Sequence, residues 1–281
     1  MNKVFLRLLS FFFVLPALLI VAMWDWAYHL PLALVAVVIS ALGAGETAAL
    51  LRTKGLDLNP YLPYALGMLF PTLAYLQNAG ILNADLSLLL VALVLVAVLV
   101  RQIFANTEEN LEPVLAKVTG ILFTIIYPGF FVYWILQINT LPQAWLLMPI
   151  FLVAVFGNDA GAWLLGSLFG KHSRKPFIVS PSKSLIGFIG GIGATFGILV
   201  VAFFLIPGHL LGSRLEAILG LAAVLALTTI AGDLFESSLK RSARVKDSGD
   251  LIPGRGGVLD SIDSLLFSAP VFYLFLQYGR I

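Results

Sequence analysis

Long apolar runs recur along the whole chain, each close to the length that an α-helix needs to cross a membrane. Crossing the hydrocarbon core takes roughly 20 consecutive apolar residues. Hydrophobic residues make up 60% of the chain and charged residues only 11%, against roughly a quarter charged in soluble domains. The sequence therefore predicts an all-α integral membrane protein. We expect about nine transmembrane helices, near residues 5–24, 29–50, 61–79, 86–101, 118–137, 144–168, 185–206, 215–236 and 261–279.

The first apolar run has a positively charged start, with Lys3 and Arg7. A start of this kind is also typical of a secretory signal peptide. Because no convincing small-residue cleavage site follows, we interpret the run as a transmembrane helix.

Positive charges are divided unevenly between the two sides of the predicted bundle. With a cytoplasmic N-terminus, only Arg214 and Arg280 of the 17 Lys and Arg residues fall on the outer side. Cytoplasmic loops of membrane proteins carry an excess of Lys and Arg. We therefore expect a cytoplasmic N-terminus and two long cytoplasmic loops, 169–184 and 237–260, on the side where nucleotides are available.

Composition excludes several kinds of site. The chain has no cysteine, which rules out disulfides, thiolate metal sites and cysteine nucleophiles. Its three histidines lie in different predicted loops or helix ends, so a histidine-based zinc site is not expected. The net charge of +2 conceals the strong sidedness, which favours anionic lipid surfaces and anionic ligands. We expect no nucleic acid partner.

A polar cluster separates the last two apolar runs. Eleven charged residues fall between Asp233 and Asp263, together with a loop rich in Gly and Pro. Carboxylate oxygens are preferred ligands of Mg²⁺, whereas Lys, Arg and backbone N–H groups bind phosphate. The mixture predicts a metal bound to a polyphosphate. The charged residues are Asp233, Glu236, Lys240, Arg241, Arg244, Lys246, Asp247, Asp250, Arg255, Asp260 and Asp263.

Two carboxylate pairs frame this cluster. Asp233 and Glu236 lie at the end of one predicted helix, and Asp260 and Asp263 lie at the start of the next. Residues three apart share a helix face, so the two pairs could converge on one or two divalent cations. Lys240, four residues after Glu236, leaves open the simpler interpretation of an ion-paired helix end at the membrane interface.

The loop between these pairs contains Gly254-Arg-Gly-Gly directly before the last predicted helix. It is not a Walker A sequence, since no Gly-Lys-Ser/Thr follows. Backbone N–H groups at a helix N-terminus bind anions, so the position of the loop predicts phosphate binding at Gly256 and Gly257.

A second polar region begins inside the sixth run. An intramembrane carboxylate such as Asp159 needs a partner or a polar cavity, so we interpret it as a site residue. Ser180 to Ser184 predicts a turn and a helix N-cap, with Lys183 contacting either phosphate or anionic headgroups. Glu46, in the second run, is a weaker intramembrane candidate. Close helix packing is the better explanation for Gly157, Gly161, Gly166 and Gly170.

The polar cluster matches a long and chemically mixed pattern. It resembles the signature of the phosphatidate cytidylyltransferases, also called CDP-diacylglycerol synthases. The specific motifs cover about residues 157–264, whereas the N-terminal helices agree only in being hydrophobic. The resemblance is carried by Ser238-Leu-Lys-Arg-x4-Lys246-Asp247-x-Gly249-x2-Ile252-Pro253-Gly254-x-Gly256-Gly257-Val-Leu-Asp260-x2-Asp263, by Gly232-Asp233-x2-Glu236, by Asp159-x2-Ala162-Trp163 and by Ser180-Pro181-x-Lys183-Ser184.

The resemblance implies an enzyme that converts CTP and phosphatidic acid into CDP-diacylglycerol and pyrophosphate at a Mg²⁺-dependent site open to the cytoplasm. A second cation and a homodimer are left open. The expected cation ligands are Asp233, Asp260 and Asp263. The groups expected to stabilise the triphosphate or the leaving pyrophosphate are Lys240, Arg241 and Lys246, with Asp247 orienting the lysines. The expected substrate-binding residues are Asp159, Lys183, Ser184, Arg255, Gly256 and Gly257.

The resemblance also sets the expected domain organisation and location. We expect one continuous membrane domain in a bacterial inner membrane. Residues 1–117 would supply N-terminal helices and a cytoplasmic connector, and residues 118–281 would form the catalytic region.

Three positions depart from the family pattern. Arg255 replaces a common His, Ser261 replaces a common Arg, and Ile186 replaces a common Glu. Arg255 can still bind phosphate, but it cannot serve as a general base at neutral pH because arginine stays protonated.

Two other functions compete with this interpretation. A CTP-dependent lipid alcohol kinase of the phytol or dolichol kinase type would release CDP instead of pyrophosphate. A cation-coupled transporter would use the intramembrane carboxylates Asp159 and Glu46 as an ion path. The concentration of polar residues at one predicted membrane face argues against the transporter.

Overall fold

The computed structural model describes residues 13, 15–104, 113–206, 211 and 214–279. Within these residues the fold is helical, and the one isolated β-bridge joins Ile252 and Gly256. The α-helices are α2 (Trp26–Arg52), α3 (Leu62–Gly67), α4 (Leu69–Asn78), α5 (Ala84–Arg101), α7 (Val114–Thr124), α8 (Phe131–Gln137), α9 (Ala144–Phe169), α10 (Leu185–Leu205), α11 (Leu215–Ser242) and α12 (Leu259–Tyr278).

The predicted all-α membrane architecture is confirmed. Seven helical spans in the described part of the chain are long and apolar enough to cross a membrane. They coincide with seven of the predicted runs, and α7 and α8 form one span through a π-helical turn at Ile125–Phe130. The protein is therefore an integral membrane protein. The run at 5–24 falls largely outside the described residues, although residues 15–23 are helical.

The run predicted at 61–79 is divided at Met68 into α3 and α4, and neither helix alone is long enough to span. Pro71 explains the break, because it has no N–H to donate to the Gly67 carbonyl one helical turn earlier. The Ser40 hydroxyl of α2 donates to that carbonyl instead, at 2.6 Å. A neighbouring helix thus satisfies the backbone group that proline leaves free, as apolar surroundings require.

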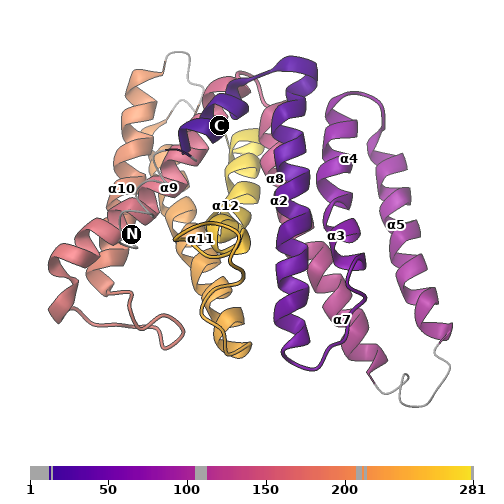
Figure 1. The fold of residues 1–281 in the computed structure, drawn as a ribbon. Coiled ribbons are helices and arrows are strands. Elements are labelled where there is room, and N and C mark those ends of the chain that lie inside the picture. Colours follow the sequence, from indigo (N-terminus) through magenta and orange to yellow (C-terminus); the bar gives the residue numbers. More distant parts are fainter. Residues whose placement is uncertain (1–12, 14, 105–112, 207–210, 212–213, 280–281) are drawn as a thin grey trace.

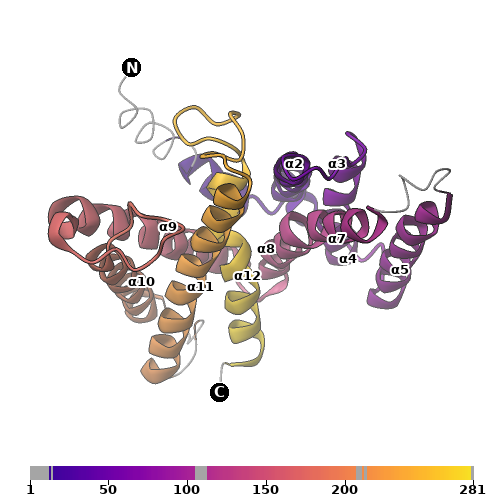
Figure 2. The same cartoon turned by 90° about the horizontal axis from the view of Figure 1, so that it is seen from below.

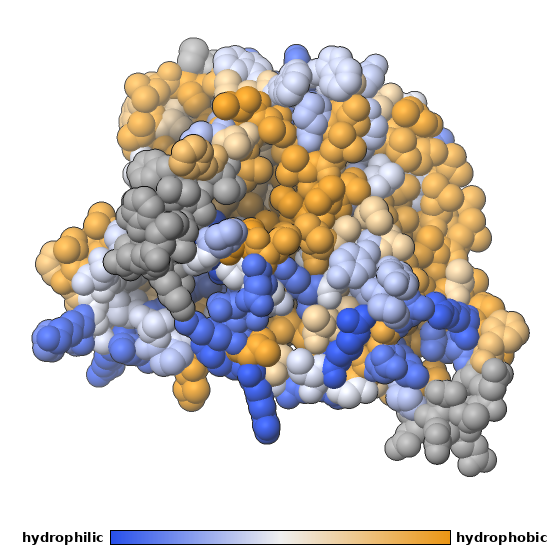
Figure 3. Space-filling model, viewed as in Figure 1, coloured by the Kyte–Doolittle hydropathy of each residue, from blue (hydrophilic) through white to orange (hydrophobic). Residues whose placement is uncertain are grey.

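The helices form two groups joined by α8. Figures 1 and 2 show α2 to α5 together with α7 on one side and α9 to α12 on the other, with α8 between them. The connections that follow α2, α9 and α11 leave from the same end, the lower end in Figure 1. Hydrophilic side chains gather along this end, and a broad hydrophobic surface lies above them (Figure 3).

Small residues let α9 and α10 approach closely, as the glycine spacing predicts. A methyl group added at Gly161 would lie 2.7 Å from the Gly190 carbonyl oxygen of α10. Beside this contact, the Asn158 amide donates to the Thr195 hydroxyl at 2.9 Å. The close backbone approach and the polar link together hold α9 against α10, next to the polar pocket described below.

This packing predicts that Gly161→Ala destabilises the protein although alanine is the better helix former. The added methyl group would overlap backbone at Gly190 and force the helices apart, which costs about 1–3 kcal/mol for overpacking. We expect a thermal midpoint lower by several degrees in detergent, measured by tryptophan fluorescence. Gly193→Ala on α10 is the matched control, because nothing lies within 4 Å of its added methyl group. Equal midpoints for the two variants would contradict the close contact.

Candidate active site

A polar pocket of about 500 Å³ lies where α9, α10, α11 and α12 meet. It brings together residues from both polar regions of the sequence. Asp159 is exposed because its side chain opens into this pocket, whereas Asp263 is only 7% exposed. The polar and charged lining residues are Asn158, Asp159, Ser167, Ser182, Lys183, Ser184, Asp233, Asp260, Asp263 and Ser264.

Gly232 allows α11 and α12 to approach at the wall of this pocket. A methyl group at Gly232 would overlap the backbone carbonyl of Asp263. One turn away toward the other end of α11, the hydroxyls of Thr229 and Ser268 are 2.9 Å apart and share a hydrogen bond. This close approach sets Asp233 of α11 and Asp263 of α12 along the same pocket.

Lys183 supplies a positive charge to the polar pocket. It lies in the turn before α10 and forms an ion pair with Asp233 of α11. Burial lowers the pKa of the Lys183 ammonium, and the carboxylates of Asp263 and Asp159 oppose that shift. Next to it, Ser184 is the N-cap of α10 and accepts a hydrogen bond from the Gly187 amide at 3.1 Å. The predicted turn and N-cap are confirmed.

Lys240 joins α11 to α12 through Asp260, which lines the pocket. Its ammonium forms ion pairs with Glu236 on its own helix and with Asp260 at the start of α12. Glu236 is completely buried, and such a charge needs a partner to be tolerated. The ion-paired helix end that the i, i+4 spacing suggested is thus present, with Asp260 as an additional member.

Asp260 organises the loop between α11 and α12. One of its carboxylate oxygens accepts hydrogen bonds from the Ser248 amide at 2.8 Å, the Ser248 hydroxyl at 2.9 Å and the Gly257 amide at 2.8 Å. Gly256 has φ +106°, and a Cβ there would lie 2.6 Å from the same oxygen. The loop can wrap around this carboxylate because glycine occupies that position.

Glu46 fixes the same loop from the other group of helices. Its carboxylate accepts hydrogen bonds from the backbone amides of Val258 and Leu259 and from the Ser248 hydroxyl, each at 2.8 Å. An anion is favoured at a helix N-terminus, where backbone N–H groups lack partners. Glu46 was only a weak candidate in the sequence, because its partners lie more than 200 residues away. Its position inside an apolar run was the only signal.

The start of α12 is therefore occupied by protein carboxylates. The amide of Gly257 donates to Asp260, and those of Val258 and Leu259 donate to Glu46. Phosphate binding at Gly256 and Gly257 through the helix N-terminus stays a prediction. It would require a phosphate to displace one of these carboxylates.

Several predicted site residues lie away from the polar pocket. Arg241 is exposed, and its Nε donates to the Val179 carbonyl at 3.3 Å, which links α11 to the loop before α10. Lys246 and Asp247 are exposed in the loop after α11 and are not among the pocket-lining residues. Arg255 lines a separate, apolar pocket. Some of the predicted site residues thus line the polar pocket, and others lie in or beside the loop after α11.

The three predicted cation ligands line one pocket but do not form a closed metal cage. Among the described residues, no three Asp, Glu or His side chains are placed to hold a metal ion. Asp260 already accepts hydrogen bonds from Ser248 and Gly257. The carboxylates of Asp233 and Asp263 nevertheless supply the hard oxygen donors that suit Mg²⁺, which is usually held by one or two carboxylates together with substrate phosphates. The donor chemistry of the pocket therefore fits a cation that substrate helps to bind.

Comparison with known proteins gives the chain a family. The model of the cytidylyltransferase family matches residues 5–279. A phosphatidate cytidylyltransferase of Bacillus subtilis is 32% identical over 249 residues, covering 85% of this chain and 87% of that protein. One of Aquifex aeolicus is 35% identical over 161 residues, covering 57% of each chain.

A relative without an assigned function is also similar. The uncharacterized protein YnbB of Escherichia coli is 40% identical over 149 residues, covering 52% of this chain and 48% of YnbB. The match therefore spans about half the length of YnbB, and little more of the Aquifex protein. The family model and the Bacillus protein, in contrast, also align with the N-terminal helices, where the sequence alone offered only hydrophobicity. The chain belongs to the cytidylyltransferase family.

Proposed function

We propose that this protein transfers the cytidylyl group of CTP to phosphatidic acid and releases CDP-diacylglycerol and pyrophosphate. Its relatives in Bacillus and Aquifex are named for this activity. The observation that carries the proposal is a carboxylate-lined pocket built into the helices of an integral membrane protein, at the meeting point of both family motifs. Such a pocket gives a water-soluble nucleotide and a membrane lipid a common place to react.

The reaction needs no nucleophile from the protein. The phosphomonoester of phosphatidate is largely dianionic near neutral pH, since its second pKa is about 6. One of its oxygens forms a bond to the α-phosphorus of CTP, and the bond from that phosphorus to the bridging oxygen of the β-phosphate breaks, so that pyrophosphate leaves. The chain must position two polyanions and offset the charge on the leaving group.

Charge balance in the polar pocket favours a cation requirement. Asp159, Asp233, Asp260 and Asp263 line it, and Lys183 is the one lysine or arginine among the described lining residues. An uncompensated pocket of this composition would repel a triphosphate. Mg²⁺, when bound, would supply the compensating charge and polarise the phosphate oxygens. Asp233 and Asp263 are the residues we propose to hold it, with Asp260 beside them.

We propose that three cations contact the phosphates, whereas Lys240 supports two carboxylates. Lys183 lies in the pocket, where it can exchange its ion pair with Asp233 for a contact with phosphate. Lys240 holds Asp260 and Glu236 in place. Arg241 and Lys246, both exposed near the loop, are available to stabilise the triphosphate or the departing pyrophosphate.

The first prediction concerns the reaction itself. Purified protein in detergent, given CTP, phosphatidic acid and Mg²⁺, should form lipid-linked cytidine and pyrophosphate in equal amounts. Asp233→Asn should lower kcat/KM at least ~100-fold, because it removes a proposed cation ligand and the partner of Lys183. Chelation of Mg²⁺ should abolish product formation and added Mg²⁺ should restore it.

The matched control is Asp57→Asn, the same change at an exposed carboxylate in the α2–α3 connection. It should stay within about twofold of the unmodified protein. Release of CDP with a polyprenyl or phytyl alcohol, without lipid-linked cytidine, would move the protein to the lipid alcohol kinases. Inactivity with every lipid, combined with ion flux in vesicles, would support the transporter.

A second prediction concerns Glu46 as a positioning residue. Glu46→Gln keeps the shape but places an N–H₂ group against backbone amides that need an acceptor, so part of the hold on the loop is lost. We expect kcat/KM to fall about 10–100-fold, the range typical when a group that orients site residues is changed. Glu46→Asp should recover part of the loss.

Glu216→Gln is the control, since Glu216 is exposed in the first turn of α11. It should leave activity unchanged. A Glu46→Gln variant with full activity would show that the anchored loop is not needed for catalysis.

A third prediction concerns orientation. Because the chain has no cysteine, single cysteines can be labelled without background. With the pocket proposed to face the cytoplasm of a bacterial cell, Lys175→Cys should react with a membrane-impermeant maleimide only after the membrane is opened. Ile81→Cys, 65% exposed at the opposite end, should react in intact spheroplasts. The reverse pattern would invert the proposed orientation.

A further inference from the structure

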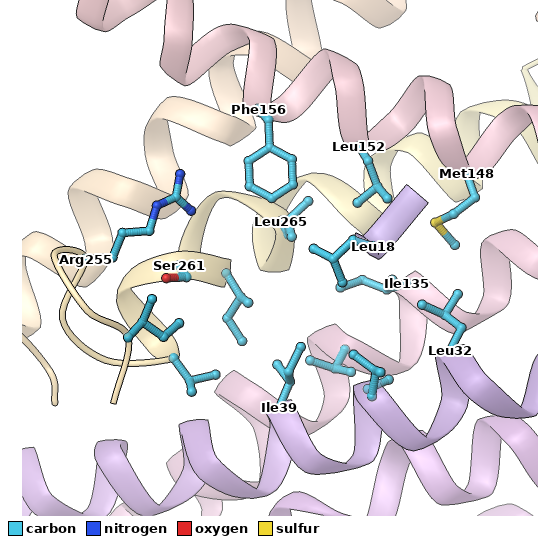
Figure 4. A pocket seen from close by; sticks show the side chains of 16 residues that line it. Leu18, Leu32, Ile39, Ile135, Met148, Leu152, Phe156, Arg255, Ser261 and Leu265 are labelled. Carbon is cyan, nitrogen blue, oxygen red and sulfur yellow. The ribbon is translucent and has the colours of Figure 1, made fainter. Parts of the chain in front are cut away.

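A second pocket, of about 150 Å³, lies between α2, α8, α9 and α12. All of its lining residues are apolar except Arg255 and Ser261. Figure 4 shows these two at one end, while Leu32 and Met148 lie toward the other. The pocket is therefore a hydrocarbon-like cavity with a single positively charged end.

The first turns of α12 form a wall between the two pockets. Ser261, Ile262 and Leu265 line the apolar pocket, whereas Asp260, Asp263 and Ser264 line the polar one. Successive helical residues are rotated by about 100°, so these two sets occupy different faces of the same helix. One helix thus presents carboxylates to one pocket and apolar groups to the other.

α9 connects the same two pockets along its length. Met148, Leu152 and Phe156 line the apolar pocket, and Asn158 and Asp159 line the polar one. The change from one lining to the other takes place within less than one helical turn. A ligand that is apolar at one end and charged at the other would match an apolar pocket that lies next to a charged one.

Arg255 lies at the junction. It is half-buried at the charged end of the apolar pocket. Figure 4 shows it at the same end as Phe156, the α9 residue of this pocket nearest in sequence to Asn158 and Asp159. An arginine guanidinium can bind a phosphate through two parallel hydrogen bonds. Its position therefore suits a phosphate that lies between a hydrocarbon chain and the carboxylate pocket.

We propose that the apolar pocket holds the headgroup-proximal part of an acyl chain of the lipid substrate, with Arg255 contacting the lipid phosphate. The proposal rests on the function proposed above. Apart from Arg255 and Ser261 at one end, the lining offers no polar group that could bind a cytosine or a ribose, whereas dry apolar cavities of this size accept small hydrocarbon groups. At about 30 Å³ for each water-sized group, the volume accommodates ~5 methylenes. The remainder of the chain would extend into the surrounding membrane.

The test compares substitutions that fill the pocket with substitutions beside it. Val35 of α2 lines the pocket, and Val38 on the same helix is 55% exposed. Val35→Phe should raise KM for a dioctanoyl phosphatidate at least 10-fold and leave KM for CTP within twofold. Val38→Phe should change neither. Equal effects of the two variants on the lipid KM would overturn the proposal.

Arg255 is tested in the same way against Arg174, which is exposed in the loop after α9. Arg255→Gln should raise the lipid KM about 10-fold or more without changing the KM for CTP, and Arg255→Lys should recover part of the loss. Arg174→Gln should have no effect. An unchanged lipid KM in Arg255→Gln, or a rise confined to CTP, would refute the role of Arg255.

Failure of this proposal and failure of the proposed function give different results. If the unmodified protein forms no lipid-linked cytidine, the function itself is wrong. In that case, binding of a spin-labelled phosphatidate in nanodiscs still tests the pocket. Immobilisation of the label that is lost in Val35→Phe and kept in Val38→Phe would support the site, and immobilisation equal in both variants would exclude it.

Discussion

Carboxylates buried among apolar helices must each find a hydrogen-bond donor or a cation, and the arrangement at the start of α12 follows from this constraint. Glu46 and Asp260 share the Ser248 hydroxyl, and together they accept the amides of Gly257, Val258 and Leu259. These bonds satisfy backbone groups that a helix N-terminus leaves free. They also tie α2 to a loop more than 200 residues later. The position of the candidate site relative to the N-terminal helices therefore depends on a few charge-assisted hydrogen bonds.

The sequence predicted what depends on local pattern or on the cost of burial. Apolar run length identified the spans, the glycine spacing identified the contact at Gly161, and the cost of an intramembrane charge placed Asp159 in a polar pocket. What it missed depends on long-range pairing. Glu46 can accept these hydrogen bonds only because α12 begins beside α2. The spacing of residues in a single sequence does not show which distant helices lie side by side. The division between α3 and α4 could be predicted in part, because Pro71 removes a backbone donor. The compensating hydrogen bond from Ser40 could not be predicted.

The first turns of α12 line two pockets of different chemistry. Its start is anchored by Glu46, and its next residues alternate between a carboxylate-lined surface and an apolar one. A one-residue shift in the helix register would rotate each side chain by about 100° and exchange polar for apolar lining. The anchoring bonds thus do more than stabilise the loop, since they fix which residues face each pocket. A glycine-rich loop can adopt many conformations. The several hydrogen bonds to the loop and to the first turn of α12 hold it in one of them.

Ion pairs within the protein also limit how the site can receive a polyanion. Lys183 is paired with Asp233, and Lys240 with Glu236 and Asp260, so both lysines are already engaged by carboxylates. Under the proposed function, a cation and a phosphate arriving together can exchange partners with the first pair, the carboxylate turning to the cation and the ammonium to the phosphate. The number of charge pairs is then conserved, and neither group is left buried alone. Lys240 has two carboxylate partners in a more enclosed position, so its release would leave Glu236 without compensation. The two lysines therefore differ in kind: Lys183 suits exchange with substrate, and Lys240 suits the support of Asp260.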